Sequence, residues 1–194
     1  KLYYSFLDDN PRPDAAVIQA LNEGASRIVV LEAFLTISNH TAEGKHQIDS
    51  VRVEDYGVPI QFTGPMWDSD TLQQMFVEEA NAAVGDGDRS KVGIMLVGHG
   101  QPDEWDVEWA TETEQEILFR QKIMDKLVEN GYVRDNMDLA WMEFKQPKVT
   151  QGVQEVLKND IDMLMYFSAS SLVRKYPVKN LYHTPLSPRS TFTQ

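Results

Sequence analysis

A histidine between two glycines directly follows an apolar run in the middle of this chain. Residues 92–97 are apolar or small, and Gly98, His99 and Gly100 come next. A run rich in Val, Ile and Leu without alternation is typical of a strand buried on both faces, and the glycines allow a sharp turn where it ends. Because an imidazole binds metal ions and transfers protons near neutral pH, His99 is the first candidate for chemistry.

A carboxylate and a second histidine follow two other predicted strands. Glu143 comes after the strand predicted at residues 139–142, and His40 comes after the one predicted at 27–36. Ligands of open α/β sheets bind at the carboxyl ends of the strands, so we expect His99, Glu143 and His40 at one sheet edge. Imidazole and carboxylate ligands with positions left open suit Fe²⁺, Co²⁺ or Ni²⁺.

Each of these residues also has an interpretation without chemistry. A histidine in a turn is more often a structural residue. In that interpretation, His99 and Glu143 form a structural hydrogen bond at the strand ends and take no part in chemistry. His40 then lies on a solvated edge between a loop and a helix. Trp141 and Phe144 favour a chemical role for Glu143, because desolvation by aromatic neighbours raises a carboxyl pKa towards that of a proton acceptor.

The elements that must position these residues alternate between helices and strands. Long apolar periodic segments separated by Gly, Pro and Asp clusters predict helices near residues 10–24, 68–84, 111–130 and 147–159, and strands near 27–36, 58–62, 92–98, 139–142, 163–167 and 178–182. Strands separated by helices of this length predict parallel sheets covered on both faces.

The two halves of the chain resemble each other. Pro11 pairs with Pro147 and Ile28 with Leu164 at the same offset, so we predict two lobes, residues 1–85 and 86–194. Chance similarity between two α/β segments is the alternative. If the repeat is real, both copies are incomplete: we expect a further strand and helix before Phe6 and a further loop near Ser171, lost through truncation or disorder.

Composition excludes several function classes. The chain has 194 residues, no cysteine and a net charge of −12. Thiolate chemistry and disulfides are therefore absent, and the acidic surface argues against nucleic acid as a partner. No apolar run reaches the roughly 18 residues of a membrane span. We take the cytoplasm as the default compartment and leave the oligomeric state open.

Three passages of the chain resemble the class II chelatases, the family of sirohydrochlorin cobalt- and ferrochelatases and protoporphyrin ferrochelatases. They are residues 98–100 (GHG), residues 141–147 (WMEFKQP) and residues 25–40, the last of which is His40. The resemblance implies an α/β fold of two flavodoxin-like lobes, with parallel sheets flanked by helices. It also implies that His99 contacts the metal ion, that Glu143 is the family's acid and that His40 is its second histidine.

The same resemblance implies an activity, namely insertion of Fe²⁺ or Co²⁺, or of Ni²⁺, into a tetrapyrrole. The metal is then a substrate, and no permanently bound cofactor is needed. Trp105 and Trp67 are candidate stacking surfaces for the macrocycle, and Arg52 is a candidate partner for its acid groups. The sequence departs from the family in two ways: the second lobe has no counterpart of His40, and the acid of the first lobe is Asp8 or Asp9.

Two details refine these expectations. Val97 and Gly98 stand where the protoporphyrin enzymes usually have Ser and Ala, which favours a sirohydrochlorin-like substrate. His183 is expected to be structural. A protein of the same fold that binds a tetrapyrrole or a metal ion without turnover is the main alternative, and a small-ligand binder in which His99 is structural is another.

Overall fold

The computed structural model describes residues 1–168 and 171–178 of the chain. They form two compact units, the first made of residues 1–69 and 104–116 and the second of residues 70–103 and those from 117 onward. From the sequence we expected a lobe boundary at residue 85; α3 (Asp70–Val84) belongs to the second unit. Helix α4 (Asp106–Glu129) contributes to both units, and its helical geometry is interrupted at Trp109.

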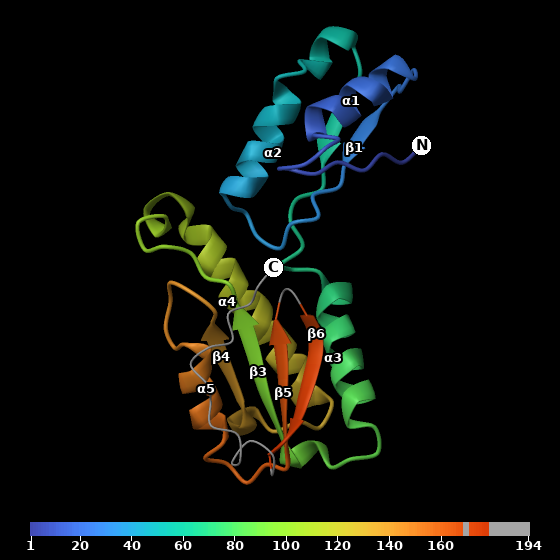
Figure 1. The fold of residues 1–194 in the computed structure, drawn as a ribbon. Helices are drawn as coiled ribbons and strands as arrows, with labels where there is room; N and C mark the ends of the chain where they lie inside the picture. Colours follow the sequence, from blue (N-terminus) through green and yellow to red (C-terminus); the bar gives the residue numbers. More distant parts are fainter. Residues whose placement is uncertain (169–170, 179–194) are drawn as a thin grey trace. The chain divides into compact units, whose positions relative to one another are not determined.

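Residues 1–69 of the first unit form two helices and two short parallel strands (Figure 1). In chain order these are α1 (Pro13–Asn22), β1 (Ile28–Val30), α2 (Asn39–Asp49), a 3-10 turn (Val53–Tyr56) and β2 (Ile60–Phe62). The strand predicted over residues 27–36 is much shorter than expected, because its only strand partner, β2, is itself three residues long. The polar segment after it forms α2, whose first turn is closed by hydrogen bonds between Ser38 and Thr41.

The second unit contains a four-stranded sheet with helices on both faces. Its remaining elements are β3 (Val92–Gly98), β4 (Met137–Trp141), α5 (Val149–Val156), β5 (Met163–Ser168) and β6 (Ser171–Pro177), with 3-10 turns at Arg89–Lys91 and Arg134–Asn136. The strand order is β4-β3-β5-β6, in which β4, β3 and β5 run parallel and β6 runs antiparallel to β5.

The expectation of a fully parallel sheet is therefore wrong at β6. Only residues 169–170 separate β5 from β6, and a parallel pair needs a crossover of a dozen or more residues. A connection of two residues is too short for a parallel partner, and it lies where we expected a further loop from the sequence. The strand expected at 178–182 and His183 lie, apart from Val178, outside the described residues.

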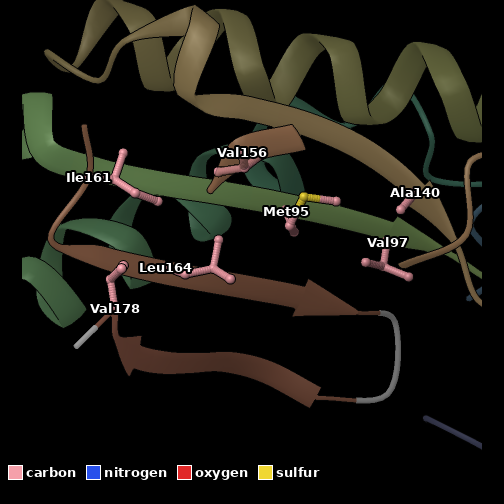
Figure 2. Packing of buried hydrophobic residues seen from close by; sticks show 7 residues of the cluster. All are labelled: Met95, Val97, Ala140, Val156, Ile161, Leu164 and Val178. Carbon is pink, nitrogen blue, oxygen red and sulfur yellow. The ribbon is translucent and has the colours of Figure 1, made fainter. Parts of the chain in front are cut away.

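The core of the second unit lies on both faces of β3, whose residues are all buried. On one face, Met95 and Val97 pack with Ala140 of β4, Val156 of α5 and Leu164 of β5 (Figure 2). On the other face, the ring of Phe167 lies 5.8 Å from that of Phe76 on α3, which in turn lies 5.7 Å from Phe119 on α4. Burial of the whole strand agrees with its uninterrupted apolar sequence.

Both predicted copies of the repeat contain a helix followed by a parallel strand. Helices α1 and α5 begin at Pro13 and Val149, and each leads into a strand of the following segment. Before each helix a backbone N–H donates to the carbonyl oxygen of the corresponding proline, from Phe6 to Pro11 (3.0 Å) and from Trp141 to Pro147 (2.9 Å), although the two donors do not correspond at the offset of the repeat. The copies then diverge, because β1 is followed by α2 and β5 by β6.

Candidate functional site

His99 is the first residue after β3 and is exposed. Its strand lies between β4 and β5: the crossover from β3 leads through α4 to β4, and the next leads from β4 through α5 to β5, on the other side of β3. At such a point a crevice forms outside the carboxyl ends of the strands, which is where α/β proteins bind ligands. His99 thus lies at the end of a buried strand, as the apolar run before it predicts.

The histidine ring is held in a defined orientation. Its Nδ1 lies 2.8 Å from the carbonyl oxygen of Gly100, and its ring centroid lies 6.1 Å from that of Phe144. A carbonyl oxygen only accepts hydrogen bonds, so Nδ1 carries the proton in this contact. The lone pair of a neutral His99 is therefore on Nε2, the nitrogen left available to a metal ion or a proton.

Glu143 lies in the segment beside His99. The N–H of Met142 donates to the carbonyl oxygen of Gly98 (2.8 Å), and that of Glu143 donates to the carbonyl oxygen of His99 (3.0 Å). The pairing of β3 with β4 thus continues past both strands and brings the two segments together. Both side chains are exposed, so they can meet a ligand from solvent.

Gly100 makes the close approach of these segments possible. Its φ of +83° is in the left-handed region, and a Cβ placed on it would lie 2.6 Å from the carbonyl oxygen of Glu143 and 3.3 Å from the ring of Trp141. Behind this contact, Lys145 forms an ion pair with Asp103 (2.6 Å). The glycine is therefore needed for space as well as for backbone conformation.

Replacing Gly100 with alanine is expected to separate the two segments. The matched control is Gly131→Ala, which also has a positive φ (+92°) but whose Cβ would meet no atom closer than 3.9 Å. Both variants share the conformational cost, and Gly100→Ala should lose about 1–3 kcal/mol more through steric overlap. Hydrogen exchange of the Glu143 amide should accelerate only in Gly100→Ala; equal exchange in the two variants would contradict the contact.

His40 lies on the exposed surface of α2 in the first unit, and the strand before it, β1, belongs to a different sheet from the one that ends at His99 and Glu143. Its helical neighbours are engaged: Asp49 pairs with Lys45 (2.7 Å), and Glu43 accepts from Gln47 (3.2 Å). These contacts favour the solvated-surface interpretation of α2. In the part of the chain that the structure describes, no three or more His, Cys, Asp or Glu side chains form a group able to hold a metal ion.

The predicted substrate-binding residues lie in the first unit. Trp105 is 45% exposed, Trp67 is half-buried, and Arg52 is paired with Asp55 at 3.1 Å. An exposed pair of this kind is weak, so Arg52 can exchange its partner for a ligand carboxylate at small cost.

One residue close to the site of the second unit was not predicted from the sequence. Arg120 of α4 is only 5% exposed, and its guanidinium lies 4.0 Å from the ring centroid of Trp141, the last residue of β4. A cation–π contact in a dry environment contributes up to about 2 kcal/mol. A signal for Arg120 was present in the sequence, because Arg120 stands at helical spacing from Ile123 and Leu127, which are both fully buried.

Comparison of the sequence with protein-family models finds no matching family, and comparison with curated proteins finds no match. Within the described ranges, no helix combines the length and apolar character that a bilayer crossing requires.

Proposed function

We propose that this chain inserts a divalent metal ion, Fe²⁺, Co²⁺ or Ni²⁺, into a tetrapyrrole, as a class II chelatase. The observation that carries the proposal is the pair of adjacent strand ends that present His99 and Glu143 to solvent, with Nε2 of His99 left available. The strand order β4-β3-β5 is also the order in which the first three strands of a flavodoxin-like sheet are arranged, which supports the finer fold assignment.

The chemistry requires two protons to leave the macrocycle as the metal ion enters. Two pyrrole N–H groups lose their protons, and the four ring nitrogens then bind the ion. Nε2 of His99 delivers the metal ion or accepts one of these protons, and the Glu143 carboxylate ligates the ion or accepts the other. Two protein ligands leave coordination positions open for the ring nitrogens, so the ion can be handed over.

Substrate contacts follow from the same proposal. Trp105, Trp67 and Arg52, all in the first unit, remain the candidate groups for binding a macrocycle: an indole stacks on a planar ring, and an arginine pairs with carboxylates. Binding energy from these contacts bends the ring so that its nitrogens become accessible. Sirohydrochlorin is the preferred macrocycle, because Val97 and Gly98 precede His99.

The test is an anaerobic insertion assay with the purified chain, Co²⁺ or Fe²⁺, and either sirohydrochlorin or protoporphyrin. The absorption spectrum should change to that of the metallated macrocycle faster than in the protein-free reaction, with sirohydrochlorin the better substrate. A rate equal to the protein-free rate with both macrocycles rejects the proposal.

One observation also favours binding without turnover. An exposed imidazole with a free Nε2 can ligate the metal of an already metallated tetrapyrrole without help from a carboxylate. A macrocycle that binds saturably while the insertion rate stays at the protein-free level would select this second function.

A further inference from the structure

The first unit contains a cavity of about 630 Å³ that no part of the proposed function uses. The N-terminal segment, residues 1–5, lines one side, β1 lines the other, and α1 lines the space between them. Apolar side chains remain exposed around it: Leu2, Tyr4 and Leu31 are each more than 70% exposed, and Val29 is 55% exposed. Exposed apolar groups that surround a cavity indicate a missing partner.

The repeat shows what fills the equivalent space in the second unit. There β3 lies between β4 and β5 and packs against α5 (Figure 2). The residues that press on β3 are Ala140, Gly152, Val156, Ile161 and Leu164. Their counterparts at the offset of the repeat are Tyr4, Ala16, Ala20, Ala25 and Ile28, and all five line the cavity.

The backbone edge of β1 is free to pair. Ile28 donates to the carbonyl oxygen of Pro59 (2.9 Å), and the carbonyl oxygen of Val30 accepts from Thr63 (3.1 Å), so both residues face β2. In a parallel ladder the residue between them, Val29, directs its N–H and C=O to the opposite edge. The described sheet of the first unit has only the strands β1 and β2, so no strand of the described chain pairs with that edge.

The opposite wall is fixed to α1. Glu23, next to the end of α1, accepts hydrogen bonds from Lys1 (2.6 Å) and from the hydroxyl of Tyr3 (2.9 Å). The pKa of Glu23 is lowered from 4.5 to about 2. The hydrogen bond from Lys1 contributes most to this shift, followed by those from Gln19 and Tyr3. The cavity therefore has two defined walls and a helical floor.

We propose that this cavity is a docking site for an apolar, uncharged polypeptide strand that pairs parallel to β1, as β3 pairs with β5. An uncharged strand fits best because the floor is formed by apolar residues such as Ala16, Val17 and Ala20, which offer no partner to a buried charge. The charged groups of the lining have partners in the chain: Lys1 pairs with Glu23, and Arg27 donates to Gln61.

The lining also predicts which side chains fit. Gly93 of β3 has no room for a Cβ, which would lie 2.5 Å from Ile161 and 2.6 Å from Val156, whereas the counterparts of these two residues are alanines. Conversely, a Cβ on Gly152 would lie 2.5 Å from Met95, and its counterpart Ala16 carries that Cβ. The cavity should therefore prefer a larger second residue and a smaller fourth residue than β3 has.

The test uses the 194-residue chain and two labelled peptides with a Gly-Ser tail. One has the β3 sequence, Val-Gly-Ile-Met-Leu-Val-Gly, and the other is Val-Ala-Ile-Val-Leu-Val-Gly. Fluorescence anisotropy should show saturable binding of both, with the second peptide binding tighter, and hydrogen exchange at the Val29 amide should slow. A version with proline at the central position should not bind, because proline disrupts a paired strand.

Matched variants locate the binding. Ala16→Leu fills the cavity, whereas Ala15→Leu makes the same change at the exposed neighbouring position of α1, outside the cavity. Ala16→Leu should weaken peptide binding about tenfold or more, and Ala15→Leu should leave it within about twofold. Equal binding to the two variants, binding of the proline peptide, or no saturable binding overturns the proposal. A dimer that Ala16→Leu abolishes would instead assign the site to a second copy of the chain.

Discussion

Replacing His99 with alanine is expected to lower the rate of metal insertion by about 10²- to 10⁴-fold, the range typical of a lost general acid–base group. Nε2 of His99 is the only nitrogen of this ring left available, because Nδ1 faces the carbonyl oxygen of Gly100. The loss should appear in kcat more than in KM, since the imidazole acts on the reacting atoms and contributes little to macrocycle binding. The measurement is the anaerobic insertion assay.

The matched control is His46→Ala, which removes an exposed imidazole from α2 and should retain the wild-type rate. Added imidazole should restore part of the activity of His99→Ala, because the exposed site is open to a small molecule. If His99→Ala keeps the wild-type rate, His99 has no part in the reaction and the proposed mechanism fails.

The second large effect is expected on stability. Met95→Ala should lower the free energy of unfolding by about 2–5 kcal/mol, because Met95 is fully buried between β3 and α5 and its removal leaves a cavity (Figure 2). Urea unfolding followed by circular dichroism measures this difference.

Met75→Ala is the control for this prediction. It removes a methionine side chain from α3, where Met75 is 46% exposed. This change should alter the free energy of unfolding by no more than about 0.5 kcal/mol. Similar losses in the two variants would show that Met95 does not lie in a closely packed core.

Much of the candidate site was predictable from the sequence. The apolar run before His99 and the short strand before Glu143 both mark strand ends, and neighbouring parallel strands end at the same edge. The orientation of the His99 ring was not predictable, because it depends on the carbonyl of Gly100 and on the contact with Phe144. Arg120 was missed because a cation over a buried ring is a contact between distant parts of the chain.

Local patterns by themselves determined the elements whose periodicity is strong. The helices α1, α3 and α5, the buried strand β3 and the repeat of helix and strand all follow from apolar spacing and from the positions of Pro and Gly. These features depend on neighbours within a few residues, so the sequence contains enough information to place them.

Only the tertiary structure decided how the elements pair. It limited β1 to three residues, turned β6 antiparallel, assigned α3 to the second unit and left the edge of β1 open beside a cavity. Strand pairing joins residues that are far apart in the chain, and a strand exists only as long as its partner does. No local pattern records which partner a strand will find, which is why these features required the folded structure.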